Sequence, residues 1–336
     1  MRFPLWLLAT VLLCTAQESA DFRVSVDLVP VTCAVTGHDG QAILDMRAEE
    51  FVLLDNGKPR PVQYLWHELD APLTVGLVVD ISGSQSQFVR EHRQTIAQFL
   101  QQVLRPQDQA FMVAVGPGVK LASGLTSSVP DLRAAVERLD PRVMFNPRAL
   151  ARYEDLGDQC MEPPPGYIVG RRLPPGLIMT NWWCGGTLLW NGIYSSARLE
   201  TKSVSGRKAL VVLTDGLDTG HGLGTHTLND AIEAAQGADT VVYTIHYAAE
   251  LPAMMRLGSG NRLRRLATQT GGRAFEDPKG NPSEIFTEIE RELRSLYVLA
   301  FAAPEKERDG KFHKLEVKSK RSGVTVRARK GYQAVP

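Results

Sequence analysis

The sequence has no excess of positive or negative charge, and it has no long apolar run beyond the one near its N-terminus. These two absences argue against a nucleic-acid-binding protein and against a membrane-spanning protein. Lys and Arg number 38 and Asp and Glu number 37, so the net charge is near zero. Proteins that bind nucleic acid usually carry a basic excess, so none is expected as a partner. Beyond the N-terminal region, no segment approaches the roughly 18 uninterrupted apolar residues of a membrane-spanning helix.

Short catalytic signatures are also missing. The sequence contains no G-x-S-x-G, H-E-x-x-H, phosphate-loop or C-x-x-C pattern. We therefore expect the chain not to be an enzyme. A metal-dependent hydrolase stays the alternative, because a bound metal ion can activate water, although no general base is evident.

The N-terminus has the features of a secretory signal peptide. Arg2 precedes an apolar stretch from Leu5 to Leu13, and small residues at Cys14-x-Ala16 follow it. Cleavage after Ala16 would release an exported protein, periplasmic or extracellular. Lipid attachment at Cys14 is the alternative, but Leu13 is a poor fit before a lipidated cysteine.

Cysteine is scarce, and three cysteines follow the signal peptide. An oxidising compartment permits one disulfide, and Cys160 and Cys184 are the expected pair because they flank one irregular segment. Cys33 lies in an apolar, strand-like run and is predicted to be a small buried hydrophobic residue. A three-cysteine metal site is the alternative, although no C-x-x-C spacing supports it.

The centre of the chain alternates buried strands with amphipathic helices. Residues 73–80 (LTVGLVVD) and 208–216 (KALVVLTDG) are continuous apolar runs typical of a parallel sheet. Residues 86–104 and 282–296 have the apolar spacing of helices. This alternation predicts an α/β fold with a doubly wound, mainly parallel, Rossmann-like sheet.

Both ends of the mature chain have strand signals. Asn56-Gly57 predicts a hairpin, and Lys and Arg alternate with apolar residues near the C-terminus, as on a solvated sheet face; a nucleic-acid patch is the alternative. Few strands form a poor core alone, so we expect the two ends to combine into one β-sandwich-like unit. The expected regions are a signal peptide (1–16), N-terminal β-strands (22–70), the α/β domain (71–296) with an irregular loop (141–184), and C-terminal β-strands (297–336).

The irregular loop interrupts the α/β pattern with many Pro and Gly residues. A loop of this length in a compact domain is usually functional or disordered. It contains Tyr167, Trp182 and Trp183, and aromatic residues often anchor protein interfaces. We predict an ordered surface loop with these three as candidate partner-binding residues; packing within the loop is the alternative role for the tryptophans.

Three segments are predicted to bring oxygen-bearing side chains to the carboxyl edge of the sheet, where ligands bind in such folds. They are residues 80–84 (DISGS), 185–187 (GGT) and 214–216 (TDG). Two carboxylates and three hydroxyls suit Mg²⁺ or Mn²⁺ better than zinc. The alternative is that these residues form turns and helix caps, with Ser84 or Ser86 capping the next helix.

The three segments together resemble the metal-ion-dependent adhesion site (MIDAS) of von Willebrand factor type A (VWA) domains, over roughly residues 71–280. The flanks resemble the exported VWA-related proteins described from Acidobacteria. The resemblance implies a divalent-cation-dependent interaction or adhesion with a protein partner that presents a carboxylate. It implies hydroxyl ligands from Ser82, Ser84 and Thr187, with Asp80 and Asp215 acting directly or through water.

Two features depart from the family pattern. Gln85 stands where an apolar residue, often Met, is frequent, and the long loop precedes Thr187. Asp218 is a candidate supporting residue or an ordinary turn residue. A zinc site is the alternative role for the histidines expected near this edge, which are His221, His226 and His246. The alternative function is a structural component of an exported assembly, with a metal that stabilises its fold.

Overall fold

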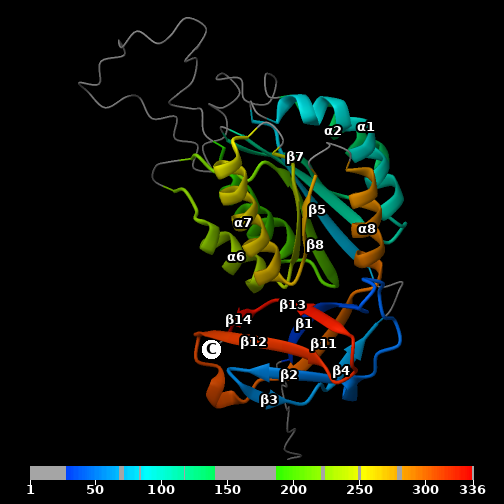
Figure 1. Ribbon diagram of the computed structural model, residues 1–336, viewed down its shortest axis with the longest axis vertical. Helices are drawn as coiled ribbons and strands as arrows, with labels where there is room; N and C mark the ends of the chain where they lie inside the picture. The colour runs from blue at the N-terminus through cyan, green and yellow to red at the C-terminus, as the bar shows by residue number, and fades with distance from the viewer. Residues whose placement is uncertain are drawn as a thin grey trace, which may run out of the picture.

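The described residues form three β-sheets (Figure 1). The computed structural model describes residues 28–67, 72–82, 85–116, 118–140, 187–220, 224–248, 251–277 and 282–334. A six-stranded sheet with helices forms one half of the molecule. Two four-stranded sheets form the other half, and Figure 1 shows that they contain strands from both ends of the chain.

The six-stranded sheet has the strand order β10-β9-β8-β5-β6-β7. All its strand pairs are parallel except β6 with β7, which are antiparallel. The strands are β5 (Leu73–Asp80), β6 (Gln109–Val115), β7 (Val119–Thr126), β8 (Arg207–Thr214), β9 (Val241–His246) and β10 (Ala274–Glu276). The central strands β5 and β8 are buried along their whole length because helices cover both faces.

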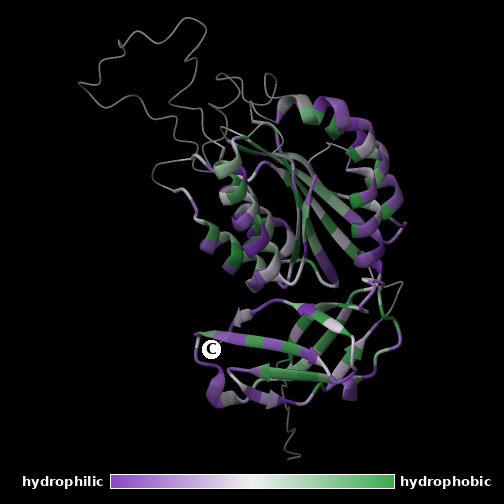
Figure 2. Cartoon of the chain, in the orientation of Figure 1, coloured by the Kyte–Doolittle hydropathy of each residue, from purple (hydrophilic) through white to green (hydrophobic). Residues whose placement is uncertain are grey.

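Successive side chains of β5 point to opposite faces of the six-stranded sheet, so a separate hydrophobic core lies on each face. Leu77 and Val79 pack in the core beneath α1 (Ser86–Val103), α2 (Val129–Glu137) and α8 (Ser283–Arg294). Val78 packs in the core beneath the other helices. These are α5 (Leu189–Ser195) with its π-helical continuation η3 (Ser196–Thr201), α6 (Leu228–Gly237) and α7 (Ala253–Thr270). Figure 2 shows hydrophobic residues along the central strands and many hydrophilic residues on the helices.

The N- and C-terminal strands share two sheets, β13-β1-β11-β4 and β14-β12-β2-β3. Strand β1 pairs antiparallel with β11 and β13, and β12 pairs antiparallel with β2. A common apolar core includes Val31, Leu53, Phe301 and Leu315. The elements are β1 (Leu28–Thr36), η1 (Ala48–Glu50), β2 (Phe51–Asp55), β3 (Lys58–Arg60), β4 (Tyr64–Trp66), β11 (Tyr297–Ala302), η4 (Glu305–Glu307), β12 (Phe312–Ser319), β13 (Thr325–Ala328) and β14 (Gly331–Gln333).

The predicted fold class is confirmed: a doubly wound, mainly parallel sheet accompanies strands from both ends that pair with one another. The hairpin at Asn56-Gly57 joins β2 to β3, and both residues have positive φ (48° and 77°), as a type I′ turn requires. Cys33 is fully buried and unpaired, as predicted. Among the described residues, no helix is long and apolar enough to cross a membrane.

Candidate metal centre

Asp80 is the last residue of β5 and lies at the carboxyl edge of the six-stranded sheet. The parallel register of β5 and β8 places Val79 opposite Leu213, so Asp80 is beside Thr214. The Asp80 side chain is buried, with the residue only 1% exposed. Its Oδ2 accepts a hydrogen bond from Thr214 Oγ1 (2.7 Å), and its Oδ1 accepts one from the backbone N–H of Ser82 (2.9 Å).

The electrostatic environment of Asp80 disfavours its negative charge. Burial, and then the neighbouring charge of Asp215, raise the pKa of Asp80 to about 7, although hydrogen bonds from Ser82 and Thr214 oppose this shift. These hydrogen bonds come from the hydroxyl groups of Ser82 and Thr214 and from the backbone N–H of Ser82, and Asp80 forms no ion pair with a described residue. A cation bound beside Asp80 would favour its ionised form, because an opposite charge lowers a carboxyl pKa.

Asp215 immediately follows β8 and is also 1% exposed. Its Oδ1 accepts a hydrogen bond from the backbone N–H of Leu217 (3.0 Å), and its Oδ2 accepts one from Gln85 Nε2 (3.2 Å). The same Gln85 amide donates to the carbonyl of Tyr247 (3.2 Å). Gln85 therefore orients the Asp215 carboxylate, a role that an apolar residue at this position could not perform.

Thr187 lies two residues before the start of α5 and is 7% exposed. Its backbone N–H donates to Thr219 Oγ1 (2.9 Å), and its carbonyl accepts hydrogen bonds from the backbone N–H groups of Thr219 (3.1 Å) and Gly220 (3.3 Å). The next residue, Leu188, donates its N–H to the carbonyl of Gly116 at the end of β6 (2.8 Å). These bonds fix Thr187 between the segments that follow β6 and β8.

The structure thus places Asp80, Ser82, Thr187 and Asp215 at one edge of the sheet, and their assignment as metal ligands stays a prediction. Helix α1 begins at Ser86 after an N-cap at Gln85 that makes no capping side-chain bond, so Ser86 is not the cap. Several predicted features lie outside the described residues: Ser84, Cys160, Tyr167, Trp182, Trp183, Cys184, His221 and residues 1–16.

Asp218 and His246 contact the backbone of segments that carry the candidate metal ligands. Asp218 Oδ1 accepts a hydrogen bond from the backbone N–H of Trp190 (3.4 Å), in the first turn of α5. His246, at the end of β9, is 2% exposed, and its Nε2 lies 3.0 Å from the backbone carbonyl of Asp215. Its Nδ1 lies 2.7 Å from Glu276 Oε2. His246 therefore supports the Asp215 backbone. In the sequence, only the position of His246 at the end of a predicted strand indicated that it would lie near this site.

The described histidines do not form a zinc site at this edge. Both ring nitrogens of His246 already face protein oxygens. The ring of His226 stacks on Tyr194 with 3.5 Å between centroids. These contacts assign both histidines to packing and hydrogen bonding.

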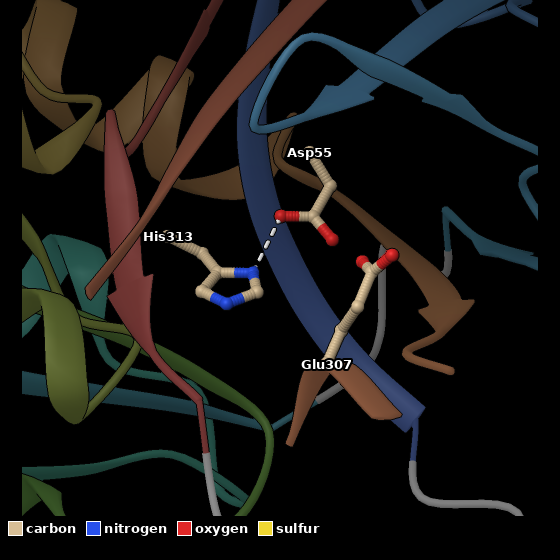
Figure 3. Close-up of side chains that lie close together, drawn as sticks. All are labelled: Asp55, Glu307 and His313. Atoms are coloured by element: carbon tan, nitrogen blue, oxygen red, sulfur yellow. Dashed lines mark hydrogen bonds and ion pairs between the residues drawn. The ribbon is translucent and has the colours of Figure 1, made fainter. Parts of the chain in front are cut away.

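A second group of potential ligands lies in the terminal-strand unit and was not predicted. Asp55, Glu307 and His313 offer ligand atoms that all lie within 4.8 Å of one another (Figure 3). The close-up shows the three side chains converging, with His313 Nδ1 2.9 Å from Asp55 Oδ1. They are far apart in the sequence, on β2, η4 and β12, so no local motif could have indicated them.

This group already contains its own cations. Arg60 Nη2 lies 3.1 Å from Asp55 Oδ2 and also forms an ion pair with Glu307. Lys58 Nζ lies 2.9 Å from Glu307 Oε1. A metal ion here would compete with the Arg60 guanidinium for both carboxylates. We therefore interpret the group as an ion-pair network that is buried at Asp55 and His313, is exposed at Lys58, and joins β2, β3, η4 and β12.

No model of a known protein family matches the chain, and no curated protein matches it. Among solved structures, the chain is similar to proximal thread matrix protein 1 from the mussel byssus, at 12% identity and a TM-score of 0.46. That match covers 80% of this chain and 50% of the mussel protein, so the chain spans about half its length.

Two further structures give similar values. One is described as von Willebrand factor type A from Catenulispora acidiphila, at 13% identity and a TM-score of 0.45, covering 92% of this chain and 74% of the other. The mussel protein with a zinc-occupied MIDAS motif matches at 13% identity and a TM-score of 0.45, covering 71% of this chain and 49% of that one. The family that the sequence motif resembles is therefore represented among the similar structures.

Proposed function

We propose that the chain is an exported, non-catalytic binding module that uses a divalent cation to hold an acidic group of a protein partner. Asp80, Ser82, Ser84, Thr187 and Asp215 are the proposed ligands, and Mg²⁺ or Mn²⁺ is the proposed ion. The N-terminal features support export to the periplasm or the cell exterior. In this proposal, residues 71–296 carry the site, and the strands of residues 22–70 and 297–336 form a supporting unit.

The observation that carries the proposal is the buried Asp80 carboxylate, whose pKa is raised by burial and by Asp215. A buried acidic group of this kind is stabilised by a cation, and Asp80 has no cationic side chain paired with it among the described residues. The oxygen atoms of carboxylates and hydroxyls are ligands that Mg²⁺ and Mn²⁺ prefer. With two carboxylates in the set, the bound ion would keep enough Lewis acidity to accept a third carboxylate from a partner.

An exposed apolar surface near the same edge favours a protein as the partner. Helix α7 begins a few residues after the carboxyl end of β9, and its first two turns expose Met254 (88%), Met255 (55%) and Leu257 (68%). Exposed groups of large apolar residues are typical of interaction sites, and methionine adapts to differently shaped partners. A partner could place an acidic side chain on the ion and apolar neighbours against these residues.

Calorimetric titration of Mg²⁺ and Mn²⁺ into metal-stripped protein tests the ion site. We expect saturable binding of one ion, abolished in Asp80→Ala and strongly weakened in Thr187→Ala. Glu307→Gln is the matched control, because it removes a carboxylate from the other candidate group. Loss of binding in Glu307→Gln but not in Asp80→Ala would move the metal to the terminal-strand unit and contradict the proposal.

Water-proton relaxation of the Mn²⁺-loaded protein tests the open coordination position. Acetate should lower the relaxation enhancement, because a carboxylate would replace water bound to the ion. Acetamide, which has a similar shape and no charge, is the matched control and should have little effect. Ion binding without any response to acetate would favour the alternative in which the metal only stabilises the fold.

A further inference from the structure

A cavity of about 370 Å³ lies where the α/β half meets the terminal-strand unit. Lys202, Lys208 and Asp239 line it from the α/β half, and Arg308 and Arg329 line it from the terminal-strand unit. Lys208 is the second residue of β8, whereas Asp215 follows the last residue of the same strand. The cavity is therefore at the opposite end of the sheet from the candidate metal centre, and its volume is in the range of small-molecule sites.

The Lys208 side chain is the most unusual feature of this cavity. The residue is only 9% exposed, yet its ammonium group makes no hydrogen bond or ion pair with any described residue. Burial lowers the pKa of Lys208, and the charge of Asp239 opposes that effect. The side chain of Lys208 is therefore largely buried while its ammonium group faces the cavity, where a bound anion could contact it directly.

Asp239 is the single carboxylate among the cavity-lining residues, and it already has other partners. Its Oδ2 accepts a hydrogen bond from Thr32 Oγ1 (2.8 Å), and its Oδ1 lies 3.3 Å from Arg329 Nε. Arg329 also donates to the backbone carbonyls of Pro30 and Gln236. Asp239 and Arg329 therefore neutralise each other and attach β1 to α6.

The remaining charges in the cavity wall are positive. Among the described residues that line the cavity, four side chains are cationic and one is a carboxylate, so positive charge predominates there. A monoanion would neutralise only part of this positive charge, whereas a phosphate ester carries nearly two negative charges at neutral pH. The wall also includes apolar groups from Leu28, Ala238, Ala303 and Tyr332, which suit an uncharged substituent.

We propose that this cavity binds a small organic phosphate, with the phosphate near Lys208 and Arg308 and its apolar substituent against Tyr332 and Ala238. Arginine binds phosphate through its planar array of N–H groups, and lysine acts as a point charge. Such a ligand would contact β8 and α6 on one side and the segments around η4 and β14 on the other. It would thereby link the two halves of the molecule, independently of the ion at the opposite edge.

Calorimetry and thermal unfolding in metal-free buffer test this proposal, with phenyl phosphate and inorganic phosphate as probes against sodium chloride at equal ionic strength. We expect one phenyl phosphate to bind more tightly than inorganic phosphate and to raise the melting temperature. Lys208→Met should weaken binding by about tenfold or more. Lys120→Met is the matched control, because Lys120 lies on β7 at the edge of the sheet, and it should bind like the wild type.

Stability separates loss of binding from loss of folding. Lys208→Met keeps the largely buried aliphatic stem and removes an ammonium group that has no side-chain partner, so without phosphate its melting temperature should be close to that of the wild type. The phosphate-dependent increase should disappear in this variant. Unchanged binding in Lys208→Met, or no saturable binding by the wild type, would overturn the proposal. Equal affinity for both phosphates would overturn the assignment of an apolar substituent.

Discussion

Two buried aspartates, Asp80 and Asp55, have opposite surroundings. Each is at most 1% exposed, and each lies near a second carboxylate, Asp215 or Glu307. Asp55 contacts the guanidinium of Arg60 and the ring of His313. The hydrogen bonds to Asp80 come instead from the Thr214 hydroxyl and the Ser82 backbone.

The difference shows how one chain can use buried carboxylates for two purposes. Where the protein supplies the cation itself, as at Asp55, the charges are satisfied within the fold and hold strands together. Where the neighbouring groups are hydroxyls, amides and another carboxylate, as at Asp80, a soluble cation can enter. The following predictions test this contrast, from the largest expected effect to the smallest.

Deletion of residues 297–336 should have the largest effect, because it removes β11 to β14 and with them His313. Strands β1 and β2 would lose their antiparallel partners. We expect residues 28–67 to become sensitive to protease, while the six-stranded sheet, whose strands are all retained, stays protected. Limited proteolysis with mass spectrometry measures both regions. Continued protection of residues 28–67 would contradict the proposal that the two ends form one unit.

Asp55→Ala should lower the free energy of unfolding by about 3–5 kcal/mol, the usual effect of removing one partner of a buried ion pair. Arg60 and His313 would then remain buried near one another without the carboxylate that joins them. Urea denaturation measures the loss. The matched control is Asp309→Ala, which removes an exposed partner of His313 and should lower the free energy of unfolding much less than Asp55→Ala does. Equal losses in both variants would contradict a structural role for Asp55.

The contribution of Asp80 to the stability of the metal-free protein should fall as pH rises from about 4 to about 7. The pKa of Asp80 is raised from 3.8 to about 7, so the folded state binds this proton more tightly than the unfolded state does. The stabilisation is therefore complete at low pH and is lost as Asp80 ionises. With about 1.4 kcal/mol for each pKa unit, its contribution is at most about 4 kcal/mol.

Asp80→Asn separates this contribution from those of other titrating groups. Urea denaturation across the pH range should show a smaller decline in this variant than in the wild type. Saturating Mg²⁺ should reduce the decline in the wild type, because binding favours ionised Asp80. An identical pH dependence in both proteins would refute the assignment to Asp80.

Gln85→Met should have the smallest effect, a change in Mg²⁺ affinity of less than about tenfold. The substitution removes the amide that donates to Asp215, but the backbone N–H of Leu217 still orients that carboxylate. Calorimetric titration measures the change. Abolished ion binding in a folded Gln85→Met protein would show that the amide is essential at this site.

Much of the fold follows from local sequence patterns. The apolar runs of β5 and β8 end in carboxylates, and Asn56-Gly57 adopts the backbone that its hairpin requires. The antiparallel edge strand β7 was not predicted, because its residues are only partly buried or exposed and lack a clear apolar pattern. Edge strands contact the core on fewer sides and therefore have weaker sequence signals.

The candidate site was partly predictable because its acidic residues stand at the ends of apolar strands that the sequence shows clearly. Asp80 is the last residue of the apolar strand β5 and Asp215 directly follows β8, and parallel neighbouring strands bring their carboxyl ends to one edge. The supporting contacts were not predictable, because Gln85 meets Asp215 across 130 sequence positions. The partner of a side chain at that sequence separation depends on how the elements pack, and the spacing of nearby residues in the sequence does not predict it.

The sequence by itself determined the strand and helix alternation and the positions of the oxygen-bearing residues at strand ends, because side-chain periodicity and backbone preference act locally. Only the tertiary structure decided which buried charges received partners. It placed Arg60 and His313 against Asp55, left Lys208 facing a cavity, and set Asp215 beside Asp80. These outcomes depend on electrostatic interactions between distant segments, and the strength of those interactions is set by separation and burial after the chain has folded.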